Sequence, residues 1–293
     1  MEVSAQPFSR LAGLSLSARW FRRLAVANAG MLILIVATGA TVRLTGSGLG
    51  CEHWPGCQVH HFEPRSYHGA IEFSNRLVAS LTILTTLVTL VFARGRRRLA
   101  GAVFAGTLAQ APLGAITIHF HLNPWLVLSH FLLSLVVLAL AVVLAADAWP
   151  RERTRLPRWV PRAGLVVGLA TCVLVVSGTL VTAAGKYPGS SGSTIVPRVW
   201  AFESAVYWHV RATAVFGISF ALLLVWLARN RAPQMRGALV LLGLLAVQMT
   251  IGEVQYRTSL PWWLVLGHVA TAAMVWSAAV AFVFSLWRPR RMP

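Results

Sequence analysis

Residues 108–130 read LAQAPLGAITIHFHLNPWLVLSH, and residues 246–268 read AVQMTIGEVQYRTSLPWWLVLGH. At an offset of 138 residues the two stretches pair Gln110 with Gln248, Gly114 with Gly252 and His130 with His268. A second match pairs residues 39–42 with residues 178–181 at an offset of 139. Self-similarity at one period indicates that the chain is built from two copies of one unit. Each copy keeps a histidine inside an apolar run.

The composition is that of a membrane protein. Mean hydropathy is +0.67, and 57% of the residues are hydrophobic while 12% are charged. Apolar runs of roughly 20 residues recur, and each is long enough to cross a hydrocarbon core of about 30 Å. The first run is too long for the apolar region of a signal peptide. We therefore expect an all-α integral membrane protein with eight transmembrane helices, over residues 24–45, 68–93, 99–120, 123–147, 162–185, 203–228, 235–256 and 261–287.

The basic residues that give the net charge of +18 are concentrated in particular segments between the expected helices and at the two ends of the chain. Arginines cluster before the first expected helix, between helices two and three, four and five, and six and seven, and in the C-terminal tail. All of these segments lie on one side of an eight-helix chain. Positive residues favour the cytoplasmic side, so we expect both termini in the cytoplasm, a lipid bilayer as the partner of the basic residues, and no nucleic acid.

Two cysteines, Cys51 and Cys57, lie in the first loop expected on the outer side. Disulfides persist on that side of the membrane, which favours a disulfide between them. A redox-active dithiol remains an alternative. A second alternative is that the two cysteines form half of a metal site, which the nearby His53, His60 and His61 would complete.

The beginning of the second expected helix carries His68, Glu72, Asn75 and Arg76. Their spacing of i, i+4, i+7 and i+8 places them on one helical face. Ionisable residues inside a membrane are costly and usually functional. The structural alternative is a local ion pair between Glu72 and Arg76 that fixes the entrance of the helix.

Three histidines lie at one depth on alternate helices. His130, His209 and His268 each lie about seven residues into a helix, roughly 10 Å from its outer end at 1.5 Å per residue. On the remaining helix of this set the same depth holds Asn75, with His68 two turns closer to water. Imidazoles that face one another across a bundle suit axial ligation of heme iron, whereas a lone buried histidine is usually structural.

Two arginines lie just beyond this depth. Arg76 and Arg211 have positions from which a guanidinium can form charge-assisted hydrogen bonds with heme propionates.

Five motifs together resemble the heme A synthase family. They are GATVRLTGSGLGCEHWPGC at 39–57, EFSNR at 72–76, QAPLGAIT at 110–117, WLVLSH at 125–130 and WLVLGH at 263–268. The resemblance covers essentially all eight expected helices. It implies two tandem four-helix bundles with pseudo-two-fold symmetry, an N-terminal one at 1–158 and a C-terminal one at 159–293.

The resemblance also implies two heme sites near the outer face of a bacterial plasma membrane. A heme b cofactor would be held by His209 and His268. The substrate heme O would be held by His130 and a partner on the second helix. Two successive hydroxylations would convert a ring methyl to a formyl group, giving heme A for cytochrome oxidase. Glu72 faces this substrate half, where it would act as a base or stabilise a developing cation.

The same resemblance implies partners. Heme O would be handed over by heme O synthase, and the electrons removed would pass to an acceptor or a quinone. We also include self-association into a homo-oligomer among the expected partners.

The chain departs from the family pattern at two places. Many members have Glu-x-x-His-Arg where this chain has Glu72-x-x-Asn75-Arg76, so that either His68 takes over as ligand or His130 binds iron alone. A second cysteine pair, frequent before the sixth helix, is missing from residues 186–200. Two other classes compete: a non-catalytic diheme cytochrome of quinone-linked electron transfer, and a transporter. The transporter is disfavoured because the repeat is parallel and the histidines lie at shallow depth.

Overall fold

Eight α-helices account for most of the structure. It is a computed structural model and describes residues 16–53, 56–58, 62–150, 156–190 and 196–287. The helices are α2 (Ala18–Leu44), α3 (Tyr67–Phe92), α4 (Arg97–His119), α5 (Pro124–Asp147), α6 (Trp159–Ala184), α7 (Phe202–Arg229), α8 (Met235–Arg257) and α9 (Trp262–Trp287). Each is long and apolar enough to cross a membrane. The expected all-α fold with eight such helices is therefore confirmed for the described residues.

Local capping explains where several helices begin. The Ser66 side chain accepts the Gly69 N–H at 2.9 Å and thereby starts α3. Asn123 caps α5, whose first residue is a proline that needs no hydrogen-bond acceptor. Helix α2 begins at Ala18, six residues earlier than expected, because Ser17 caps it and its first turns contain arginines that an apolar-run criterion excludes.

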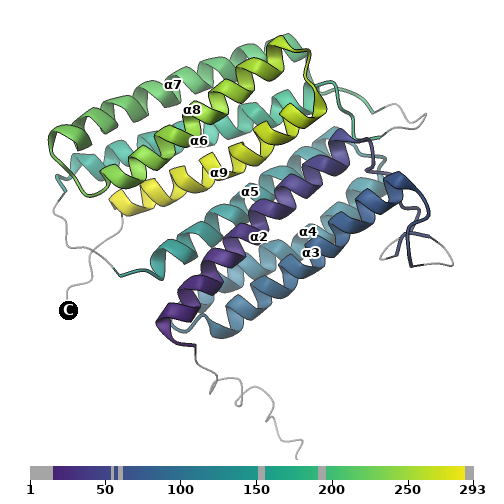
Figure 1. Ribbon diagram of the computed structural model, residues 1–293, viewed down its shortest axis with the longest axis horizontal. Coiled ribbons are helices and arrows are strands. Elements are labelled where there is room, and N and C mark those ends of the chain that lie inside the picture. Colours follow the sequence, from purple (N-terminus) through teal and green to yellow (C-terminus); the bar gives the residue numbers. More distant parts are fainter. Residues whose placement is uncertain (1–15, 54–55, 59–61, 151–155, 191–195, 288–293) are drawn as a thin grey trace, which may run out of the picture.

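The helices form two groups of four (Figure 1). In the first group α2 packs against α3 and α5, and α4 packs against the same two helices. In the second group α6 packs against α7 and α9, and α8 packs against the same two. We call these groups the N-terminal bundle (α2–α5) and the C-terminal bundle (α6–α9). They meet where α9 lies against α2 and α5, and where α5 touches α6.

An apolar core joins the two bundles. Leu32 and Val36 of α2 belong to the same buried cluster as Ala273 and Trp276 of α9. The Trp276 indole N–H also donates to the backbone carbonyl of Leu135 on α5, at 2.8 Å. This bond satisfies the polar atom of the buried indole at the interface.

The sequence repeat is reproduced in the backbone. The turn between α4 and α5 has positive φ at His121 and Leu122, and the turn between α8 and α9 has positive φ at Ser259 and Leu260. These pairs are separated by the 138-residue offset. Such values are uncommon without glycine, so their recurrence indicates that the two turns share one conformation. The pseudo-two-fold symmetry, the domain boundary at 158/159 and the cytoplasmic placement of the termini stay predictions.

The loops after α2 and α6 meet at one end of the molecule, which we call the disulfide end because Cys51 and Cys57 lie there. The Gly48 N–H donates to the Gly189 carbonyl at 2.8 Å. Arg43 of α2 donates to the Thr182 carbonyl at 3.0 Å, near the C-terminus of α6, where a cation also complements the helix dipole. Both bundles are thereby held together at this end.

Candidate heme sites and the disulfide loop

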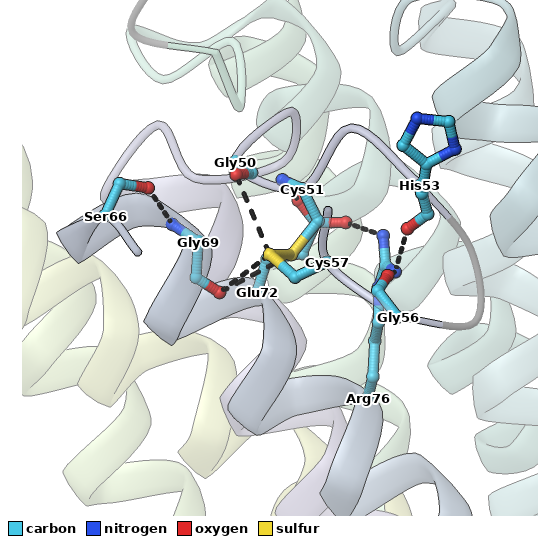
Figure 2. The surroundings of a disulfide bond; sticks show 9 residues. All are labelled: Gly50, Cys51, His53, Gly56, Cys57, Ser66, Gly69, Glu72 and Arg76. Carbon is cyan, nitrogen blue, oxygen red and sulfur yellow. Dashed lines mark hydrogen bonds and ion pairs between the residues drawn. A yellow bond between two sulfur atoms is a disulfide. The ribbon is translucent and has the colours of Figure 1, made fainter. Parts of the chain in front are cut away.

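The loop after α2, which we call the disulfide loop, is cross-linked within itself by a disulfide that lies against the first turn of α3 (Figure 2). Cys51 and Cys57 are joined, and their side chains are 4% and 1% exposed. A Cβ added at Gly50 would lie 2.5 Å from the backbone of His68, and one added at Gly69 would lie 3.2 Å from the Cys57 Sγ. Only glycine permits this approach of loop to helix. The expected disulfide is confirmed.

Glu72 and Arg76 lie directly beneath this loop. Glu72 is 4% exposed, and its Oε2 accepts the Cys51 N–H at 2.9 Å while its Oε1 accepts from Arg76 at 2.5 Å. Arg76 also donates to the carbonyls of His53 and Gly56, both at 2.6 Å. Both carboxylate oxygens are therefore engaged. The Glu72–Arg76 ion pair spans one turn of α3, and both of its members also form hydrogen bonds with the backbone of the disulfide loop.

In the C-terminal bundle, His209 of α7 is oriented by α6. Its Nδ1 lies 3.0 Å from the Ser177 hydroxyl. A Cβ added at Gly178 would lie 3.1 Å from the His209 Cε1, so the ring packs on bare backbone. A hydrogen bond at Nδ1 leaves Nε2 as the nitrogen that can bind a metal.

His268 of α9 also packs on a glycine of the neighbouring helix α8, but it is hydrogen-bonded at the other ring nitrogen, and its Nδ1 has no partner among the described residues. A Cβ added at Gly252 would lie 3.0 Å from the His268 Cε1. The His268 Nε2 lies 3.1 Å from the Gln248 amide nitrogen. The C-terminal bundle thus presents two imidazoles, one from α7 and one from α9, each packed on a glycine of the neighbouring helix.

In the N-terminal bundle, His130 of α5 occupies the position that His268 has on α9. A Cβ added at Gly114 would lie 3.5 Å from its Cε1. The His130 Nδ1 is buried and has no hydrogen-bond partner among the described residues. Gln110, the repeat mate of Gln248, instead donates to the His130 carbonyl at 3.2 Å and to Ser134 at 2.7 Å.

Asn75 of α3 takes the place of His209. The Thr38 hydroxyl donates to Asn75 Oδ1 at 2.7 Å, just as Ser177 bonds His209, and Thr38 and Ser177 are repeat mates. The equivalence of Asn75 and His209, expected from depth alone, is therefore reproduced by their hydrogen bonds. One bundle offers two imidazoles at this level and the other offers one imidazole and an amide.

His68 lies at the start of α3, seven residues before Asn75. Its Nδ1 is 2.9 Å from the Ser47 hydroxyl, and the carbonyl of His68 lies against Gly50 of the disulfide loop. These contacts direct His68 toward the loop after α2. Its role as a heme ligand stays a prediction.

The two arginines expected at heme propionates have different surroundings. Arg76 is bonded beneath the disulfide loop, as described above. Arg211 is exposed on α7, with its guanidinium 3.1 Å from the centre of the Tyr207 ring. This cation–π contact leaves the guanidinium on the surface of the helix.

Among the described residues, no group of three or more His, Cys, Asp and Glu side chains could hold a metal ion. Both sulfurs of the proposed loop metal site are used by the disulfide. His60 and His61, which would have completed that site, lie outside the described residues.

The donor set nevertheless fits heme. Axial heme ligands are single imidazoles presented from facing helices, and His209 and His268 are so presented. Glycines at 178 and 252 leave no side chain between each ring and the neighbouring helix. The glycines and Ser177 were not expected as site residues, although the repeated pairs Gly39–Gly178 and Gly114–Gly252 carried the signal for them.

Comparison with known proteins identifies the family. The family model described as COX15-CtaA, cytochrome oxidase assembly protein, matches residues 22–70 and 62–280. The chain belongs to this family. It is 30% identical to a protein named heme A synthase from Symbiobacterium thermophilum, over 79% of this chain and 84% of that protein.

Other relatives carry the same name. Heme A synthases of an Exiguobacterium species and of Listeria welshimeri are 26% and 25% identical, over 82% and 84% of this chain and 81% and 88% of their own lengths. Together with the eight apolar helices, the family makes this chain a multi-pass membrane protein of the heme A synthase family.

Proposed function

We propose that this protein is a heme A synthase, which oxidises one methyl group of heme O to a formyl group for cytochrome oxidase. The observation that carries the proposal is the difference between two equivalent sites. The C-terminal bundle presents His209 and His268, whereas the N-terminal bundle presents His130 and Asn75. Two imidazoles suit a permanently bound heme. One imidazole suits a heme that must be exchanged, because fewer bonds have to be broken for its release.

In this proposal His209 and His268 hold heme b, which supplies electron transfer when bound. The Ser177 hydroxyl fixes the orientation of the His209 ring through Nδ1, whereas Gln248, which contacts the His268 Nε2, would have to leave that nitrogen if it bound iron. Such partners of a ligand set its direction and basicity. Arg211 would meet a propionate of this heme after leaving the Tyr207 ring.

The substrate heme O would be held by His130 together with Asn75, Arg76 or His68 of α3. Counted with water as the oxygen donor, a methyl group and one water give a formyl group, four protons and four electrons. The two successive hydroxylations each contribute two of the electrons, which pass to an acceptor or quinone. Protein side chains cannot accept them.

Glu72 is proposed as the catalytic carboxylate of the substrate half. Each of its oxygens accepts one hydrogen bond, from Arg76 or from the Cys51 amide, and keeps a second lone pair that can accept a proton. The same two bonds fix the direction of the carboxylate, so Glu72 is also a positioning residue.

The arginine distribution and the disulfide support a bacterial plasma-membrane protein whose heme sites lie toward the outer face. Delivery of heme O by heme O synthase and self-association into a homo-oligomer complete the proposal.

A non-catalytic diheme cytochrome of quinone-linked electron transfer is the second candidate, because the His209–His268 pair is equally expected in such a protein. The deciding experiment expresses the chain in cells that make heme O but lack heme A. Extracted hemes are then separated by chromatography and identified by mass. Heme A in the extract supports the synthase. Reversible heme b spectra with unconverted heme O would refute it.

A further inference from the structure

The N-terminal bundle has polar side chains in the half of its interior that lies away from the disulfide. Thr82, Thr86 and Thr89 of α3 are each 1% exposed, and their spacing of four and three residues puts them on one helical face. Asn28 of α2 is completely buried, and Thr107 of α4 is 6% exposed. Three of the four helices thus contribute polar groups to this interior.

These groups extend from the level of the candidate heme site toward the opposite end. The bond between Thr38 and Asn75 sets the register of the antiparallel helices α2 and α3. Asn28 lies ten residues from Thr38, and Thr86 lies eleven residues from Asn75, so the two are at nearly the same level. From Asn75 to the last threonine of the row is fourteen residues, or about 21 Å along the helix.

The C-terminal bundle is apolar at the same places. The matched hydrogen bonds at Asn75 and His209 align α3 with α7, and the sequence repeat aligns the other helices. The apolar counterparts of Asn28, Thr82, Thr86, Thr89 and Thr107 are Val167, Phe216, Phe220, Leu223 and Leu245, which all belong to one hydrophobic core. Thr171 is a buried hydroxyl of that bundle, and it donates within its own helix. Helix packing alone therefore does not require polar residues here.

Asn28 has unused hydrogen-bonding capacity. Neither its amide nitrogen nor its amide oxygen has a partner among the described residues, although both are buried. Thr82, Thr86 and Thr89 donate to carbonyls of their own helix, which leaves acceptor lone pairs on each hydroxyl. A buried amide without partners is costly, and a polar interior of this kind is where proteins hold ordered water.

We propose that Asn28 and the threonines bind a row of ordered water molecules inside the N-terminal bundle, forming a path for protons between the Asn75 level and the end away from the disulfide. The proton traffic rests on the proposed function, because oxidation of a methyl group to a formyl group releases protons beside His130. The disulfide loop covers the other end of the bundle. The C-terminal bundle, which holds a cofactor and performs no such oxidation, has no counterpart of this row at the matched positions.

The test uses the purified heme-containing protein. Redox-induced infrared difference spectra are recorded in ordinary water and in oxygen-18 water, and bands in the O–H stretching region that shift between them belong to water. The wild type is expected to show such bands, and Asn28→Leu, which has the same branching but no polar atoms, is expected to lose them. Heme content should be retained. Heme A formation should slow on the order of tenfold or more, as expected for loss of a proton-transfer group.

Thr171→Val is the matched control, because it removes a buried hydroxyl from the other bundle, and it should keep both the bands and the rate. If Asn28→Leu does not fold, Thr86→Val keeps the side-chain shape and should show the same losses. Wild-type bands and rate in Asn28→Leu, or no isotope-sensitive bands in the wild type, would overturn the proposal. If the wild type shows the isotope-sensitive water bands but forms no heme A, the result would support bound water in the N-terminal bundle and would refute the proposed heme A synthase function.

Discussion

Replacing Gly252 by alanine should loosen heme in the C-terminal bundle. The new Cβ would lie 3.0 Å from the His268 Cε1, about 0.4 Å closer than the 3.4 Å at which ordinary contacts begin. Either α8 or the imidazole must move. Overpacking of this kind costs roughly 1–3 kcal/mol, and alanine returns up to about 1 kcal/mol through its helix propensity. The midpoints of these two ranges leave a net cost of about 1.5 kcal/mol, which is roughly a tenfold weaker hold on heme when the cost falls on the heme-bound protein.

Gly243→Ala is the matched control, since Gly243 lies on the same helix and an added Cβ would meet nothing within 4 Å. Both variants and the wild type are purified, and heme per protein is measured before and after incubation with excess apomyoglobin, which captures released heme. Gly252→Ala should lose heme faster than Gly243→Ala. Equal retention by the two variants would show that His268 does not depend on the bare backbone at Gly252.

Three further substitutions test the remaining assignments. His268→Ala should abolish most of the heme b absorption of the C-terminal bundle, and an unchanged reduced-minus-oxidised spectrum would refute that ligand. Glu72→Ala removes the acceptor of the Cys51 N–H and of Arg76; heme b should be retained while heme A disappears from extracted hemes, and wild-type product would exclude Glu72 from the reaction. Asn75→His places a second imidazole opposite His130. Electron paramagnetic resonance should then show an additional six-coordinate, low-spin heme with heme O retained, whereas an unchanged spectrum would contradict the equivalence of Asn75 and His209.

The helices were predictable to within a few residues except at α2. Seven of them begin and end where the apolar runs do, because a membrane crossing requires a continuous apolar segment. The start of α2 differed because Ser17 caps the helix before the apolar run begins. Arginines in its first turns are compatible with a helix that extends beyond the hydrocarbon core.

The site was predictable in depth but less so in contacts. Counting along the helices placed His209 and Asn75 at one level, and their bonds to Ser177 and Thr38 agree with that count. The same counting could not show that His68 bonds to Ser47 or that Arg211 stacks on Tyr207. Helical spacing gives the face of a residue, whereas its partner depends on the tilt and separation of other segments.

Sequence alone determined the number of helices and the depth of the histidines, because each follows from residues close together along the chain, and it determined the duplication, because two stretches can be compared without knowing how they pack. Only the tertiary structure decided that Glu72 holds the Cys51 amide and that the two bundles differ in polarity beneath their histidines. These features depend on atoms from separate segments meeting at hydrogen-bond distance. The order of residues along one segment does not specify which side chains of another segment it contacts, because those contacts form only when the helices pack.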